Sequence, residues 1–251
     1  LDPSDTSAFF NYYERVYNVG SSALPSGTTP LIQRMLVRTA VVIDELVTHD
    51  GLFDMRFLAA IYLLIYILLL IFCVIQFTTS YQAVISRIGW LIGLTCVFNA
   101  LWIVAWHYER LPLSLILMLG LLVSLIWINV FIRDLPDAFI KAGFGIYLGW
   151  ICIATIANVT ALLVNFGWDG SGISGQTWTI IMILAGAVIV SVTIWRLENP
   201  FIGMAVVWAF AGIMIKRQAD NRAIFITAAV MMVAVAVVLM LSFFRRRLSG
   251  A

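Results

Sequence analysis

One stretch of the chain, residues 98–109, combines an amide, two indoles and a histidine inside an apolar run. Asn99, Trp102 and Trp106 are spaced i, i+3 and i+7, so on a helix they share one face. Such a face could stack its indoles on a flat apolar molecule, while the amide hydrogen-bonds the polar edge of that molecule. The alternative is that the indoles only pack and the amide joins two helices.

A second stripe of the same kind occurs at residues 145–158. Tyr147, Trp150 and Asn158 are spaced i, i+3 and i+11, so they also share a helical face. Two such stripes facing each other would enclose a flat cavity lined by aromatic rings. The alternative is close helix packing, because the same helix carries small side chains that let helices approach: Gly145, Gly149, Ala154 and Ala157.

Two further asparagines, Asn129 and Asn165, lie in apolar runs. An amide in hydrocarbon must find a hydrogen-bond partner, so each of the four faces either another helix or a ligand cavity. His107, next to Trp106, could ligate a haem iron or a chlorin magnesium, or simply be a solvated side chain at the membrane edge. The sequence contains no nucleophile, zinc or P-loop motif and no paired carboxylates within an apolar run, which predicts a protein that is not an enzyme.

The elements that carry these stripes must lie in a membrane. Hydrophobic residues make up 63% of the 251 positions and charged residues only 11%, with a mean hydropathy of +1.02. Soluble domains carry about 25% charged residues. A net charge of +2 gives no reason to expect nucleic acid as a partner.

Seven apolar runs follow Arg56, and we predict an all-α polytopic bundle of about seven transmembrane helices. The sixth run is short for a span, and the charged residues between runs are expected in loops. The runs cover residues 57–86, 88–108, 111–132, 142–168, 170–195, 199–215 and 223–244.

Several short motifs in the apolar runs together resemble those of one known protein family. NALW at residues 99–102 with Trp106, and YLGW at residues 147–150 followed by ATIAN at 154–158, resemble the TspO/MBR family of tryptophan-rich sensory proteins. This family includes the translocator (peripheral benzodiazepine receptor) proteins. WHYERLPLS at residues 106–114 and WAFAGIMIK at 208–216 are similar to its longer bacterial branch, in which three helices follow the core.

The resemblance implies a helical bundle whose pocket binds porphyrins, haem-like tetrapyrroles, sterols or drug-like ligands, often as a dimer. It implies a pocket lined by Asn99, Trp102, Trp106, Tyr147, Trp150 and Asn158, and a multi-pass protein of the bacterial inner (plasma) membrane. We expect three regions: a polar N-terminal region with an amphipathic helix at 1–55, a TspO-like core at 56–168, and three additional helices with a basic C-terminus at 169–251.

The chain departs from the family pattern at its N-terminal end. Residues 1–30 are too polar for the family's first span, and residues 54–70 lack the proline and tryptophan expected of its next helix. These departures leave an alternative function, an accessory subunit that keeps the fold inside a larger membrane complex. A permease component is a third, weaker hypothesis.

Overall fold

The computed structural model describes residues 49–78, 81–168 and 170–249, and within these residues every regular element is a helix. The contacts divide the chain into residues 1–56 and residues 57–251, and the second unit is described below. The amphipathic helix expected within 1–55 lies outside the described residues. The all-α prediction is confirmed. The helices are α3 (His49–Ile75), α4 (Gln82–His107), α5 (Leu111–Phe131), α6 (Ala138–Asn165), α7 (Gly175–Leu197), α8 (Phe201–Arg217) and α9 (Arg222–Ser249).

The chain is a multi-pass membrane protein. Five of the described helices are long and apolar enough to cross a bilayer, namely α4, α5, α6, α7 and α9. The apolar part of α3, Ala59–Ile75, is shorter. Helix α8 has 17 residues and is therefore about 25 Å long, slightly short of a typical hydrocarbon core. Each predicted run after the first thus corresponds to one helix, and five of the described helices are both long and apolar enough to span.

The first predicted boundary is wrong. We expected one span over residues 57–86 with Arg87 outside it, whereas α3 ends at Ile75 and α4 begins at Gln82, so Arg87 lies inside α4. Polar side chains after Ile75 account for the break: Gln76 Nε2 donates to the Cys73 carbonyl at 3.0 Å and Thr78 Oγ1 to the Ile75 carbonyl at 2.7 Å. These bonds satisfy carbonyl groups that a helix end leaves free.

Local sequence explains the other helix starts. Pro112 lies in the first turn of α5, where a missing backbone N–H costs nothing. The Asp137 carboxylate caps α6 by accepting from the Ile140 N–H at 2.9 Å. Ser174 caps α7 in the same way, accepting from the Thr177 N–H at 3.2 Å.

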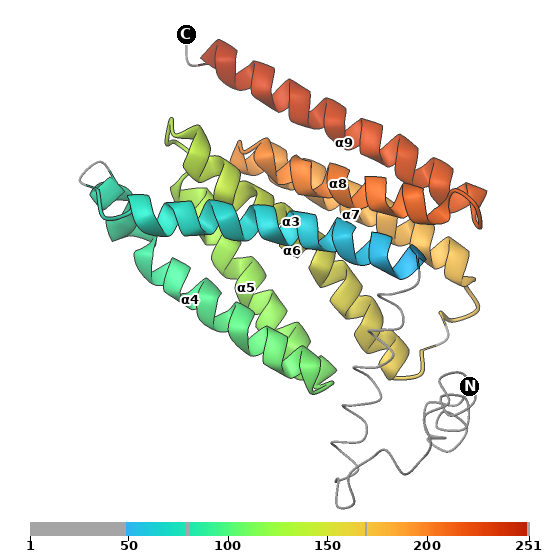
Figure 1. Ribbon diagram of the computed structural model, residues 1–251. Coiled ribbons are helices and arrows are strands. Elements are labelled where there is room, and N and C mark those ends of the chain that lie inside the picture. Colours follow the sequence, from blue (N-terminus) through green and yellow to red (C-terminus); the bar gives the residue numbers. More distant parts are fainter. Residues whose placement is uncertain (1–48, 79–80, 169, 250–251) are drawn as a thin grey trace, which may run out of the picture. The chain divides into compact units, whose positions relative to one another are not determined.

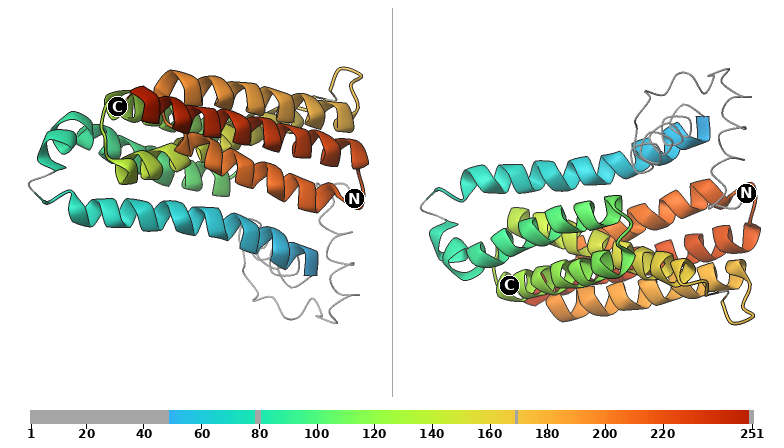
Figure 2. Two further views of the ribbon diagram at one scale, coloured as in Figure 1. Left: turned by 90° about the horizontal axis from the view of Figure 1, so that it is seen from above. Right: turned by 90° about the horizontal axis from the view of Figure 1, so that it is seen from below.

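The helices from α4 to α9 can be followed by their colours in the two views of Figure 2. Helix α5 packs against both α4 and α6, and α6 also packs against α8 (Figure 1). Helices α7, α8 and α9 pack against one another and form the C-terminal side of the unit. Helix α6 is therefore the element that joins the two halves, and it carries the second aromatic stripe.

The crossing of α6 and α8 depends on two glycines. A Cβ atom on Gly149 would lie 2.0 Å from the Ile202 carbonyl oxygen, and one on Gly145 would lie 2.7 Å from Asn199 Nδ2. Neither position tolerates a side chain without moving backbone or a buried amide. The packing interpretation of the small residues is therefore correct for these two glycines.

A buried polar cluster ties α5, α6 and α8 together beside this crossing. Asn199 Nδ2 donates to Asn129 Oδ1 at 2.8 Å and to the Lys141 carbonyl at 2.9 Å. Asn129 Nδ2 donates to the carbonyls of Leu125 at 2.9 Å and Phe144 at 3.1 Å. Both amides are fully buried, so Asn129 acts as a bond between helices rather than as a ligand anchor.

Lys141 belongs to the same cluster. The prediction that charged residues between the runs lie in loops is wrong for this lysine. It lies in the first turn of α6 and is completely buried. Its Nζ donates to the backbone carbonyl of Arg133, which follows the end of α5. A buried ammonium is tolerated because this carbonyl partner replaces water.

Candidate functional site

The α6 stripe lies in the interior of the bundle. Tyr147 is 7% exposed, Trp150 8% and Asn158 2%. Trp150 meets the ring of Tyr62 on α3 edge to face, with ring centroids 5.3 Å apart and an interplanar angle of 77°. The predicted α6 residues therefore face neighbouring helices.

Helix α3 places two tyrosines beside the α6 stripe, which the sequence alone does not indicate. Tyr62 and Tyr66 are one turn apart, with ring centroids 6.2 Å apart. The sequence signal is two tyrosines spaced i and i+4, whereas the family pattern expects a proline and a tryptophan in this segment.

The α4 stripe lies at the border of the contact between α4 and α5. Phe98 sets the rotation of α4, because its ring fills the space beside Gly120 of α5. Asn99 and Trp102 are half-buried, whereas Trp106 is 42% exposed. The Trp102 and Trp106 rings lie 6.0 Å apart at 31°, and together they form a tilted aromatic pair.

Three of the six predicted residues hold a buried nitrogen without a hydrogen-bond partner. Among the described residues these nitrogens are Trp102 Nε1, Trp150 Nε1 and Asn158 Nδ2; Trp178 Nε1, in the first turn of α7, is a fourth such atom. Trp150 Nε1 interacts with the Tyr62 hydroxyl but does not reach hydrogen-bond geometry with it, so Trp102 Nε1 and Asn158 Nδ2 are the clearest cases. A buried donor left unpaired costs about 1–3 kcal/mol. Such donors either lower the stability of the folded protein or form hydrogen bonds to another molecule.

Asn158 is the least satisfied of the interior amides. Its Oδ1 accepts from Ser114 Oγ at 3.2 Å, but Ser114 Oγ also donates to the Leu111 carbonyl at a shorter 2.9 Å. One hydroxyl proton cannot serve both acceptors fully. Asn158 thus keeps a weak shared bond on one side and an open donor on the other, in contrast to the fully bonded Asn129.

The two stripes lie on α4 and α6, and both of these helices pack against α5. A helix advances about 1.5 Å per residue, so Asn158 lies about 12 Å beyond Trp150, and Trp106 about 10 Å beyond Asn99. No ring contact or hydrogen bond between the two sets of predicted residues occurs in the described part of the chain.

The side chains on the α4 and α6 stripes are apolar apart from a few hydrogen-bond donors. No Asp, Glu, Lys or Arg occurs between Ile88 and Trp106 of α4, or between Ala142 and Asn165 of α6. His107 is exposed and meets only the ring of Tyr108, at 5.4 Å. Within residues 49–78, 81–168 and 170–249, no three His, Cys, Asp or Glu side chains gather as a metal site.

Comparison with known proteins identifies two family models. The model described as TSPO-like protein matches residues 55–241. A model described as the YfdI N-terminal transmembrane domain matches residues 1–107, which is less than half of the chain. No curated protein and no solved structure matches.

Proposed function

Since the chain belongs to the TSPO-like protein family, we propose that it binds a planar hydrophobic molecule, such as a tetrapyrrole, between α3, α4 and α6, without catalysing a reaction. The rings of Trp102 and Trp150 stack on the ligand or border it, with Tyr62 and Tyr147 completing the aromatic lining. Offset or edge-to-face aromatic contacts of this kind contribute about 0.5–1.5 kcal/mol each beyond the burial of area.

The observation that carries the proposal is the set of three unpartnered buried nitrogens on the predicted stripes. Each could donate a hydrogen bond to a nitrogen or oxygen atom at the polar edge of a planar ligand. In an apolar interior such bonds also decide specificity, because a ligand without matching acceptors leaves the donors unpaired. A tetrapyrrole offers both a large flat ring system and acceptor atoms at its periphery.

The test is a titration of the purified protein in mild detergent with protoporphyrin, followed by porphyrin absorption. We expect saturation at one porphyrin per chain. The double variant Trp102→Phe/Trp150→Phe keeps both rings but loses both N–H donors. Two lost hydrogen bonds should weaken binding about tenfold or more.

The matched control is Trp90→Phe/Trp127→Phe, which changes two tryptophans that are 67% and 52% exposed. This control should bind like the unchanged protein. Uptake that never saturates, or an equal loss of affinity in both double variants, would contradict the proposed site. A stoichiometric partner protein co-purifying with a chain that takes up no porphyrin would instead favour the accessory subunit.

A further inference from the structure

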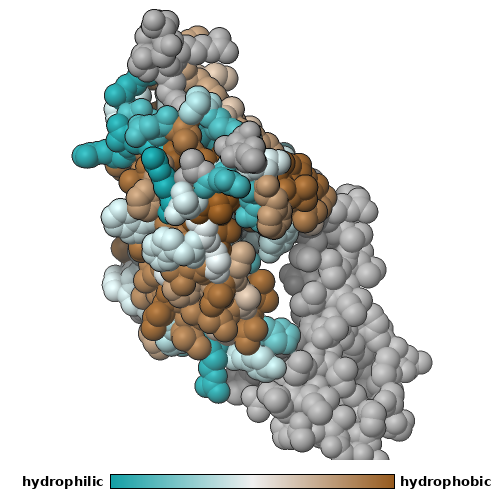
Figure 3. Space-filling model, turned by 90° about the vertical axis from the view of Figure 1, so that its left-hand side faces the viewer, coloured by the Kyte–Doolittle hydropathy of each residue, from teal (hydrophilic) through white to brown (hydrophobic). Residues whose placement is uncertain are grey.

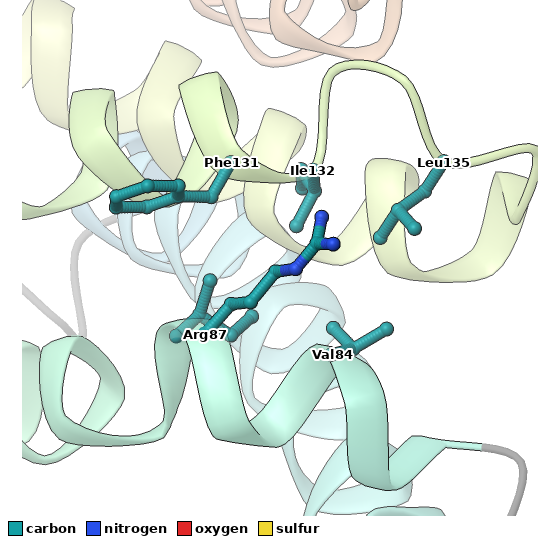
Figure 4. A pocket seen from close by; sticks show the side chains of 6 residues that line it. Val84, Arg87, Phe131, Ile132 and Leu135 are labelled. Carbon is teal, nitrogen blue, oxygen red and sulfur yellow. The ribbon is translucent and has the colours of Figure 1, made fainter.

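A cavity lies near the N-terminal end of α4, away from the aromatic stripes. It has a volume of about 100 Å³ and is lined by Val84, Arg87 and Ile88 of α4, Phe131 and Ile132 at the end of α5, and Leu135 of the following loop. Figure 4 shows the Arg87 side chain rising from α4 with its guanidinium between Ile132 and Leu135. Asn99 is twelve residues further along α4, about 18 Å away along the helix.

The guanidinium of Arg87 makes no hydrogen bond or ion pair with any residue that the structure describes. None of the acidic residues near the cavity forms an ion pair with Arg87 in the described part of the chain. Asp137 accepts from the Tyr81 hydroxyl at 2.8 Å and caps α6, and Glu198 pairs with Arg133 at 2.7 Å. Asp134, beside Leu135, is exposed and forms no ion pair.

The hydrogen bond from the Tyr81 hydroxyl to Asp137 persists at physiological pH. The hydrogen bond to Asp137 raises the pKa of Tyr81, so the phenol stays protonated and remains a donor to this carboxylate. Arg87, which is exposed, therefore presents a positive charge beside a largely apolar hollow and forms no ion pair with the described residues.

The position of the cavity places it at the boundary between membrane and water. Val84 is the first residue of one membrane span and Phe131 the last residue of the next. Figure 3 faces the end of the molecule where α3 gives way to α4, and there hydrophilic residues gather beside apolar ones. Phospholipid phosphates lie at this level of a bilayer.

We propose that this cavity binds an anionic phospholipid. The phosphate accepts hydrogen bonds from the guanidinium of Arg87, whose planar donors match phosphate oxygens. The adjoining glycerol and first methylenes of an acyl chain lie against Phe131, Ile132 and Leu135. Five of the six lining side chains are apolar, and a free phosphate would gain nothing from them, so the lining favours a lipid over a soluble anion.

Native mass spectrometry of the protein released from mixed detergent micelles tests this site. With equal amounts of phosphatidylglycerol and phosphatidylcholine, we expect the protein to retain phosphatidylglycerol preferentially. Arg87→Gln should reduce that retention at least fivefold, and Arg87→Lys should keep a part of it. The matched control is Arg110→Gln, because Arg110 is an exposed arginine beyond the opposite end of α4.

Three results would overturn the inference. The first is equal retention by Arg87→Gln and the unchanged protein, with helix content by circular dichroism showing that both are folded. The second is equal retention of the two lipids. The third is loss of the bound lipid on adding millimolar inorganic phosphate, which would assign the cavity to a free anion. None of these readouts depends on porphyrin binding, so the two proposals stand or fall separately.

Discussion

Replacing Gly149 by alanine is expected to lower the midpoint of thermal unfolding in mild detergent by on the order of 10 °C. The new Cβ would lie 2.0 Å from the Ile202 carbonyl oxygen and 3.3 Å from the Ala205 Cβ. The obstructing atom is backbone, so α6 and α8 must separate along their crossing. Overpacking of this kind costs about 1–3 kcal/mol or more. The change can be followed by circular dichroism during heating.

Gly143→Ala is the matched control on the same helix. A Cβ there meets only the Leu68 Cβ, at 3.8 Å, which is an ordinary contact. Alanine also favours the helical state by up to about 1 kcal/mol relative to glycine. We therefore expect Gly143→Ala to be as stable as the unchanged protein or slightly more stable. Equal stability of the two alanine variants would contradict the close crossing of α6 and α8.

Asn158→Leu is expected to weaken ligand binding without lowering the stability of the ligand-free protein. The substitution removes an unpaired buried donor, which costs about 1–3 kcal/mol, and a weak shared bond worth about 0.6 kcal/mol. Ser114 keeps its bond to the Leu111 carbonyl. The ligand-free protein should thus be as stable as before or more stable, while porphyrin affinity falls about tenfold. Thermal unfolding and the porphyrin titration measure the two effects.

The contrasting variant is Asn129→Leu. It removes both bonds that Asn129 donates and the one that it accepts from Asn199, so it should destabilise the bundle by about 2–3 kcal/mol. If Asn158 were only a bond between helices, Asn158→Leu would lose stability in the same way and porphyrin binding would not fall specifically. That pattern would exclude Asn158 as an anchor for the ligand.

Much of the fold could be predicted because hydrophobic runs of span length leave few alternatives to helices. The boundaries were harder wherever a polar residue serves a tertiary role. The sequence favours a loop position for Lys141, since nothing in it reveals that the Arg133 carbonyl is placed to receive the ammonium. It also favours Arg87 as the end of a run, because the break at residues 76–78 contains no charge, proline or glycine.

The stripes of the proposed site could be predicted from residue spacing. The spacing of Trp102, Trp150 and Asn158 placed each on an aromatic stripe, and the structure gives each a buried unpartnered nitrogen. Tyr62 and Tyr66 were missed because a pair of tyrosines in a lipid-facing run is not distinctive. The roles of Gly149 and Asn129 could not be assigned from sequence, since both depend on which helix crosses α6 and at what distance.

Indole N–H resonances of protein labelled with nitrogen-15 tryptophan test the central proposal most directly. The nine tryptophans give one side-chain signal each, and single Trp→Phe variants assign them. On adding protoporphyrin, we predict large shifts for Trp102 and Trp150, because their N–H groups gain acceptors beside a ring with a strong ring current. Trp90 and Trp127, which are exposed, should keep their positions. Unchanged signals for Trp102 and Trp150, or equal shifts in the exposed tryptophans, would contradict a ligand site between α3, α4 and α6.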